Sequence, residues 1–283
     1  MKGQNMINFK AKKDDEGRIL FKYLVKVCDN VPISRIERLF REKDIKVNNI
    51  RVNDKQYKVK EGDLISIYGL IETSKHIDNK ANTNINFKVI YEDKNLLIID
   101  KAPNIAMHSE ENCLDDQVLK YLNFKKVSSF RPASIGRIDK KTSGLVVYAK
   151  NYKTLVEFEN KQNKFDKIYQ FVSDFDEDVL DITVRLKKDI KNEKMIVDNN
   201  FGVKAQTIFY KEGNRKFAKI ITGKKHQIRA TLAYLKTPIL GDIKYGGKFA
   251  KRMYLHSYSI KFHDLSDDFK EYNEQVFICY PKW

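Results

Sequence analysis

Long apolar segments are missing from this chain of 283 residues. Its apolar runs are short, as in the four residues Leu96–Ile99, whereas a membrane-spanning helix needs about 20. The sequence therefore predicts no membrane partner. The first ten residues, MKGQNMINFK, lack the apolar stretch of a secretory signal, so we expect a cytoplasmic protein.

Cysteine is scarce, and familiar cofactor motifs are missing. The three cysteines, Cys28, Cys113 and Cys279, are far apart, which argues against a disulfide framework or a zinc site and fits a reducing compartment. The five histidines do not cluster at the spacing of metal ligands. There is no G-x-G-x-x-G or G-x-S-x-G, and Gly241–Lys248 only partly matches a phosphate-binding loop. We predict neither a metal nor a cofactor.

Acidic residues are outnumbered, because 54 Lys and Arg accompany 38 Asp and Glu. The net charge of +16 indicates a polyanionic partner, most simply nucleic acid. A basic surface that serves only solubility is the alternative. With 42% apolar residues the chain can bury a core, and its length predicts one large domain or two unequal ones.

The N-terminal part divides into a tail and a small domain. Residues 1–15 are polar and are predicted to form a flexible tail. Residues 16–69 show two helical patterns followed by short strands and turns. In the second helix Arg35, Arg38 and Arg41 lie three residues apart and share one basic side.

The strand and turn sequences IKVN (45–48) and VKEGDLI (59–65) strengthen this interpretation. Together with the second helix they resemble the small RNA-binding domain named after ribosomal protein S-four. The resemblance implies that the three arginines of the helix face RNA. The alternative is that they form an ordinary solvated helix face.

The C-terminal part is predicted to be an α+β domain. Residues 70–86 are polar without periodicity and are interpreted as a linker, and the domain covers 87–283. Strand patterns dominate, which favours a mainly antiparallel sheet with a few helices. The strands are expected at 87–91, 96–100, 145–148, 167–172, 182–186, 204–210, 217–222 and 253–257, and the helices at 114–122, 152–163 and 227–234.

The segment Ser134–Lys150, SIGRIDKKTSGLVVYAK, is the most informative one. It places Asp139 in a loop before a strand, where the turn Thr142-Ser143-Gly144 can fix the loop. Taken alone, such an aspartate more often satisfies turn amides than it reacts. However, the segment resembles the signature His-Arg-Leu-Asp-x-x-Thr-Ser-Gly of RluA-type pseudouridine synthases, in which the aspartate is catalytic. Gly136 stands where that signature usually has histidine.

Further segments resemble the same family in the same order. They are KIY at 167–169, ITGKKHQIR at 221–229, PILGD at 238–242 with YG at 245–246, LH at 255–256, and the opening hairpin and loop at 87–108. In that last loop Asn104 replaces a glycine, and asparagine is the least costly substitute if the position needs a positive φ. His226 and His256 are interpreted as structural histidines.

The resemblance implies roles for named residues. Asp139 would be the catalytic residue, Tyr169 would stack on the target base and Arg229 would pair with Asp139. Basic side chains would hold phosphates near the site, namely Arg137, Lys219, Lys224 and Lys225.

These observations predict an RNA pseudouridine synthase that needs no cofactor or metal. Large-subunit ribosomal RNA is the expected substrate, with transfer RNA as the alternative, and a monomer is expected. The other function considered is a non-catalytic RNA-binding or ribosome-assembly protein on the same fold. A DNA-binding role has little support, because no recognition helix is evident.

Overall fold

The computed structural model describes residues 6–70 and 83–283, which form two compact units. Unit 1 spans Met1–Asn82, Lys120–Pro132 and Asn151–Lys153, and unit 2 spans Thr83–Leu119, Ala133–Lys150 and Thr154–Trp283. Most of the predicted linker, residues 71–82, lies outside the described residues. No described helix is long and apolar enough to cross a membrane.

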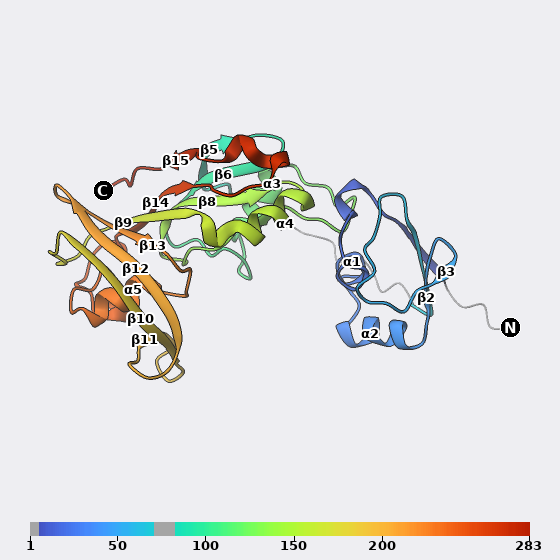
Figure 1. Cartoon of the computed structure of the whole chain (residues 1–283), viewed down its shortest axis with the longest axis horizontal. Coiled ribbons are helices and arrows are strands. Elements are labelled where there is room, and N and C mark those ends of the chain that lie inside the picture. Colours follow the sequence, from blue (N-terminus) through green and yellow to red (C-terminus); the bar gives the residue numbers. More distant parts are fainter. Residues whose placement is uncertain (1–5, 71–82) are drawn as a thin grey trace. The chain divides into compact units, whose positions relative to one another are not determined.

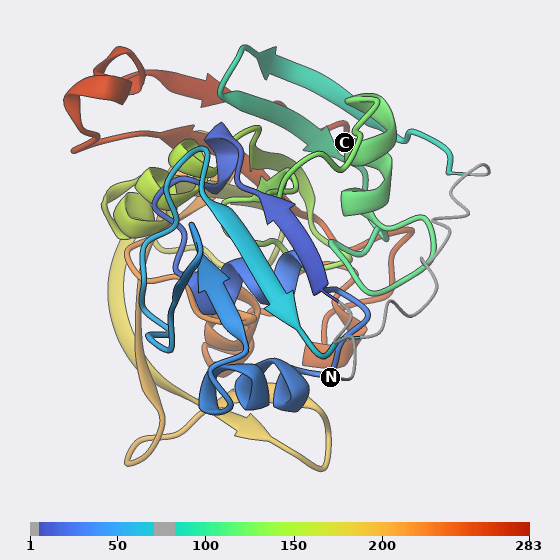
Figure 2. The same ribbon diagram turned by 90° about the vertical axis from the view of Figure 1, so that its right-hand side faces the viewer.

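Unit 1 contains a four-stranded antiparallel sheet and two helices (Figures 1 and 2). The helices are α1 (Leu20–Val27) and α2 (Ile33–Arg41), and the short 3₁₀ helix η1 spans Lys13–Asp15. The sheet order is β1 (Met6–Lys10), β4 (Leu64–Tyr68), β2 (Ile45–Val47) and β3 (Ile50–Arg51). The helices bury Leu20, Leu24, Ile36 and Leu39 against Ile65 and Ile67 of β4.

Strand β1 corrects the prediction of a flexible tail over residues 1–15 for residues 6–15, whereas residues 1–5 lie outside the described residues. Met6–Lys10 pairs antiparallel with β4, and Ile7 and Phe9 pack against the core of unit 1. Ala11 and Asp15 are buried. Two alternating apolar side chains are enough for this strand because an edge strand needs only one apolar face.

Unit 2 is built on an eleven-stranded sheet. The order is β11-β10-β12-β13-β9-β14-β8-β6-β5, with β15 added beside β14 and β7 beside β8 (Figure 1). Every described pairing is antiparallel except β14 with β8. This confirms the predicted α+β class and its mainly antiparallel sheet.

Every strand and helix predicted for unit 2 overlaps an observed one, but the strands predicted at 182–186 and 253–257 span 179–189 and 255–261. The strands are β5 (Phe87–Glu92), β6 (Leu96–Lys101), β7 (Ala133–Ser134), β8 (Ser143–Ala149), β9 (Asp166–Phe171), β10 (Val179–Asp189), β11 (Lys194–Val197), β12 (Val203–Glu212), β13 (Arg215–Ile220), β14 (Leu255–Lys261) and β15 (Val276–Ile278). The helices are α3 (Leu114–Tyr121), α4 (Tyr152–Lys161) and α5 (Gln227–Tyr234), with 3₁₀ helices η2 (Gln162–Lys164), η3 (Ile243–Tyr245) and η4 (Asp267–Tyr272). Strands β7, β11 and β15 were not predicted.

Helix α5 carries polar residues into the interior of unit 2. It packs against β10, β11 and β12 (Figure 1). Ile228 and Leu232 join a buried cluster with Phe171 and Phe209, and Arg229 beside them is also buried. A buried guanidinium needs anionic partners, because an unpaired charge in the interior costs several kcal/mol or more.

Candidate active site

The loop that carries Asp139 is fixed at its C-terminal end. It runs from β7 to β8, and the Thr142 amide donates a hydrogen bond to the Asp139 carbonyl at 3.0 Å. Gly144, with φ +105°, lies so close to β14 that a Cβ there would be 2.4 Å from the Ser257 carbonyl oxygen. The buried Lys101 ammonium donates to the Lys140 carbonyl at 3.1 Å. These contacts hold the backbone at Asp139 in place at the start of β8.

Arg229 binds two carboxylates at once. Its Nη1 donates to Asp139 Oδ2 at 2.8 Å, and its Nε and Nη2 donate to the two oxygens of Asp242 at 2.7 and 2.9 Å. Burial alone would lower the pKa of Arg229, but its bonds to Asp242 and Asp139 raise it above its ordinary value. The side chain of Asp139 keeps 26% of its surface exposed, whereas Asp242 is fully buried. Asp139 is therefore the carboxylate that a substrate can reach.

A second chain of hydrogen bonds ends near Asp139. The Met195 amide donates to the Tyr245 hydroxyl at 2.9 Å, and that hydroxyl lies 2.9 Å from His226 Nδ1. In the tautomer that carries its proton on Nε2, the Tyr245 hydroxyl donates to His226 Nδ1 and the Nε2–H faces the carboxylate of Asp139. His226 Nε2 is 3.7 Å from Asp139 Oδ2. Burial lowers the pKa of His226 to about 4, so the ring is a neutral donor facing Asp139.

Tyr169 lies on β9 beside the same carboxylate. Its ring packs partly buried against the cluster that contains Ile228, and the Ser257 side chain hydrogen-bonds to its hydroxyl. Burial and the charge of Asp139 raise the pKa of Tyr169 to about 12, which keeps the phenol neutral. The structure thus brings the predicted set of Asp139, Tyr169 and Arg229 together.

The predicted phosphate-binding residues have different surroundings. Lys224 and Lys225 are exposed in the loop before α5. Arg137 is exposed on the Asp139 loop, with Nη1 3.4 Å from His108 Nε2. Lys219 forms an ion pair with Asp166 at 2.7 Å, so its charge is partly neutralised. A surface pair of this kind is worth about 0–1 kcal/mol and can exchange for a phosphate.

The arginines of α2 are also partly engaged. Arg35 donates to the Gly69 carbonyl at 2.7 Å, and Arg38 pairs with Glu42 at 2.6 Å. Arg41 is exposed at the end of the helix. Arg35 and Arg38 would therefore exchange these contacts for phosphates if this helix binds RNA.

Sequence reasoning missed the roles of Asp242, Tyr245 and Lys101. Asp242 and Tyr245 belong to the motifs PILGD and YG, which resemble those of the family. The sequence of a turn does not reveal which distant side chains its residues bind. Lys101 donates to the carbonyls of Ala102, Ile105 and Lys140 at 2.9–3.1 Å. A lysine is rarely buried without a role, but the burial of Lys101 is known only from the structure.

The comparisons with known proteins agree with this geometry. The sequence profile of the family described as RNA pseudouridylate synthase matches residues 95–234. An uncharacterized RNA pseudouridine synthase of Mycoplasma capricolum is 36% identical over 298 aligned positions, which cover 98% of this chain and 99% of that protein. The chain belongs to this family.

Other relatives place the synthase among the RluA-type enzymes. Ribosomal large subunit pseudouridine synthase C of Rickettsia typhi is 31% identical, covering 85% of this chain and 88% of that protein. Ribosomal large subunit pseudouridine synthase D of Borreliella burgdorferi is 31% identical, covering 71% and 68%. The structure of human RNA pseudouridylate synthase domain containing 1 has the same fold, with a TM-score of 0.57 at 19% identity, covering 70% and 84%.

These findings confirm an RNA pseudouridine synthase of the RluA type, with RNA as its substrate. They do not favour the non-catalytic alternative. Gly136, the departure from the family signature, has φ +80°. Glycine adopts this left-handed conformation without strain. Asn104 has φ +66°, which asparagine adopts at small cost, and this confirms the expectation for the loop at 87–108.

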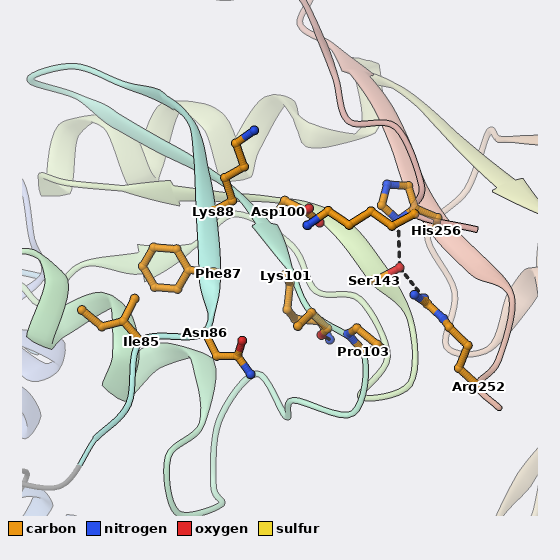
Figure 3. A pocket seen from close by; sticks show the side chains of 12 residues that line it. Ile85, Asn86, Phe87, Lys88, Asp100, Lys101, Pro103, Ser143, Arg252 and His256 are labelled. Carbon is orange, nitrogen blue, oxygen red and sulfur yellow. Dashed lines mark hydrogen bonds between the residues drawn. The ribbon is translucent and has the colours of Figure 1, made fainter.

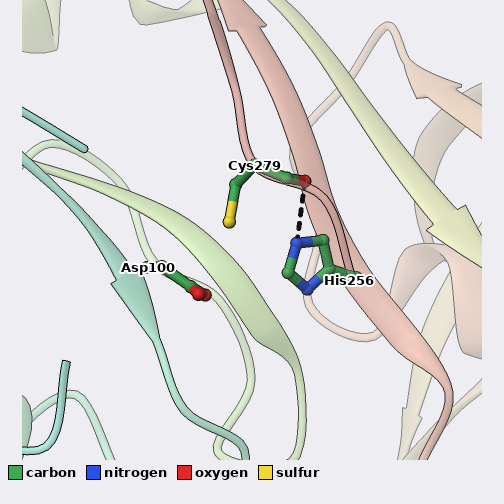
Figure 4. Close-up of side chains that lie close together, drawn as sticks. All are labelled: Asp100, His256 and Cys279. Carbon is green, nitrogen blue, oxygen red and sulfur yellow. Dashed lines mark hydrogen bonds between the residues drawn. The ribbon is translucent and has the colours of Figure 1, made fainter. Parts of the chain in front are cut away.

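A group of possible metal donors in the synthase is already hydrogen-bonded. Ligand atoms of Asp100, His256 and Cys279 lie within 4.8 Å of one another (Figure 4). Arg252 donates to Ser143 Oγ at 2.5 Å, so the hydroxyl proton points to His256 Nδ1 at 2.8 Å, and His256 Nε2 donates to the Cys279 carbonyl at 3.0 Å. Neither imidazole nitrogen then has a free lone pair for a metal.

Beside this network the synthase has a pocket of about 430 Å³ (Figure 3). Ile85 and Phe87 line one side, and Ser143, between His256 and Arg252, lines the other. None of Asp139, Tyr169 and Arg229 lines it. The pocket is therefore distinct from the candidate active site.

Acidification is expected to destabilise the synthase. Burial lowers the pKa of His256 from 6.5 to about 4. Between these values the unfolded chain binds a proton that the folded chain does not, so stability is lost as the pH falls from 6.5 toward 4. This pKa difference corresponds to on the order of 3 kcal/mol, and His226 acts in the same direction.

Melting temperatures measured from neutral pH down to about pH 4.5 test this expectation, and the slope should be shallower in His256→Gln. A wild-type melting temperature that stays constant over this range would show that neither histidine titrates as the structure implies.

Proposed function

We propose that the synthase isomerises uridines in large-subunit ribosomal RNA with Asp139 as its catalytic carboxylate. The observation that carries this proposal is the reachable Asp139 carboxylate, held by a buried arginine that Asp242 fixes from its other side. The names of the relatives from Rickettsia typhi and Borreliella burgdorferi support the choice of ribosomal RNA.

The reaction rearranges bonds without adding a group. The bond from C1′ of the ribose to N1 of uracil breaks, the base rotates, and C1′ joins C5, which gives up its proton while N1 gains one. Asp139 can attack C1′ as a nucleophile or take a proton from C2′ to form a glycal. Both routes need the Asp139 carboxylate to be anionic and held in one direction, and its bond from Arg229 provides both.

Tyr169 and His226 complete the site. A target base that leaves its stack loses a few kcal/mol, and an aromatic platform such as Tyr169 returns about 1–3 kcal/mol. His226 Nε2 faces the same oxygen of Asp139 that Arg229 binds. We assign it a positioning role, because shortening this contact orients the carboxylate further when RNA excludes water.

The remaining residues would bind RNA outside the reacting centre. Arg137, Lys219, Lys224 and Lys225 would contact phosphates in unit 2, and Arg35, Arg38 and Arg41 would do so in unit 1, as an S-four-type domain does. Such contacts position RNA without reading its sequence, so affinity should fall steeply with salt. A monomeric, cytoplasmic enzyme remains part of the proposal.

Tritium release from RNA labelled at C5 of uridine tests the substrate. Purified synthase should release tritium from unmodified large-subunit ribosomal RNA and not from an equal amount of transfer RNA. Release from transfer RNA alone would contradict the proposed substrate but not the reaction. If the synthase binds both RNAs but releases tritium from neither of them, nor from total cellular RNA, the proposed reaction is contradicted.

A further inference from the structure

A strongly basic loop follows the Asp242 position. Residues 243–252 read IKYGGKFAKR and contain four cationic side chains and no acidic one. Phe249 lies in this loop with 89% of its surface exposed, the highest value among the large hydrophobic residues described as exposed. The phenylalanine is thus flanked in sequence by lysines and does not pack into a core.

The loop is anchored beside the catalytic pair. The Gly241 amide donates to the Lys248 carbonyl at 2.8 Å. A Cβ on Gly241 would lie 1.8 Å from the Arg252 carbonyl oxygen, and one on Gly247 would lie 2.1 Å from the Ile239 carbonyl oxygen. Phe249 follows Lys248, whose carbonyl is bonded to Gly241. Gly241 in turn precedes Asp242, the residue that binds Arg229.

The charged residues around the loop also indicate that it lies near the site. Burial has the largest effect on the pKa of His226, and the charges of Asp139, Arg229, Lys225 and Lys244 come next. The two lysines therefore lie near the site. Lys248 forms an ion pair with Asp174 at 2.8 Å, but both side chains are about three-quarters exposed. An exposed aromatic ring in a segment that carries four cations and no acidic residue fits a nucleic acid better than the apolar surface of a protein.

We propose that Phe249 is a stacking platform for an unpaired base of the RNA next to the target uridine, with Lys248 and Lys251 contacting the flanking phosphates. This base is separate from the one that Tyr169 would hold. The inference rests on RNA being the substrate and is independent of the choice between ribosomal and transfer RNA.

Kinetics of tritium release test the platform. Phe249→Ala should raise KM for RNA about 5- to 100-fold, the range expected for one lost stack, and leave kcat within about twofold. Phe249→Trp should keep the wild-type KM, and Phe249→Leu should behave like the alanine variant because leucine has no π face. Phe201→Ala is the matched control, since Phe201 is 67% exposed and lies on the turn before β12.

A binding measurement keeps the test independent of turnover. The fluorescence of Phe249→Trp should be quenched by single-stranded oligoadenylate beyond any change in the wild type, whose single tryptophan is Trp283. An unchanged KM in Phe249→Ala, a leucine variant as good as the tryptophan variant, or absent quenching would each overturn the proposal. Phe249 contributes little to the core, so unchanged melting temperatures are expected throughout.

Discussion

Asp139→Asn is expected to lower the rate of tritium release by about 10³-fold or more while RNA affinity stays within about twofold. The amide has the same shape as the carboxylate, but it can neither attack C1′ nor accept a proton. Arg229 keeps its two bonds to Asp242 in the variant, so the site remains folded. Single-turnover tritium release and filter binding on the same preparation measure the two quantities.

A nearby carboxylate provides the control for Asp139. Glu110 pairs with Lys140, the residue after Asp139, at 2.6 Å, and both side chains are about half exposed. Glu110→Gln removes one negative charge from the same region and should leave the rate within about threefold. If Asp139→Asn retains more than about a tenth of the wild-type rate, the carboxylate does not perform the chemistry.

Asp242→Asn is expected to lower the free energy of unfolding of unit 2 by about 3–5 kcal/mol. Asp242 is fully buried and supplies both oxygens to Arg229. Without its charge the buried guanidinium keeps Asp139 as its only anionic partner among the described residues. Tritium release should fall as well, because Arg229 then loses the two charged contacts that fix its orientation toward Asp139.

Thermal melts and hydrogen exchange of α5 measure this loss of stability. Asp264→Asn is the matched control, since Asp264 pairs with Lys164 at 4.0 Å on the surface and its removal should cost less than about 1 kcal/mol. An Asp242→Asn variant that melts like the wild type would show that the Arg229–Asp242 pair does not hold the site together.

The elements around Asp139 could be predicted because their signals are local. The apolar pattern of β8 and the amphipathic start of α5 each appear within a few residues of sequence. The positive φ of Asn104 was also predictable, since few residue types adopt it at low cost. The family motifs then supplied the site residues, which these patterns alone could not identify.

The partners of those residues could not be predicted in the same way. Met195 lies on the unpredicted β11, far along the chain from Tyr245 and His226, so their chain of hydrogen bonds exists only after folding. Lys219 was expected to contact a phosphate. Because it lies on β13, which pairs with β9, it forms an ion pair with Asp166 instead. Pairing across a sheet depends on register, which the sequence of one strand does not specify.

The most direct test of the account is a map of pseudouridines in the ribosomal RNA of cells that lack this gene. We predict that one or a few uridines of the large-subunit RNA lose their modification and regain it when the wild-type chain is returned, but not when Asp139→Asn is returned at equal abundance. An unchanged map, or full restoration by Asp139→Asn, would contradict the central claim.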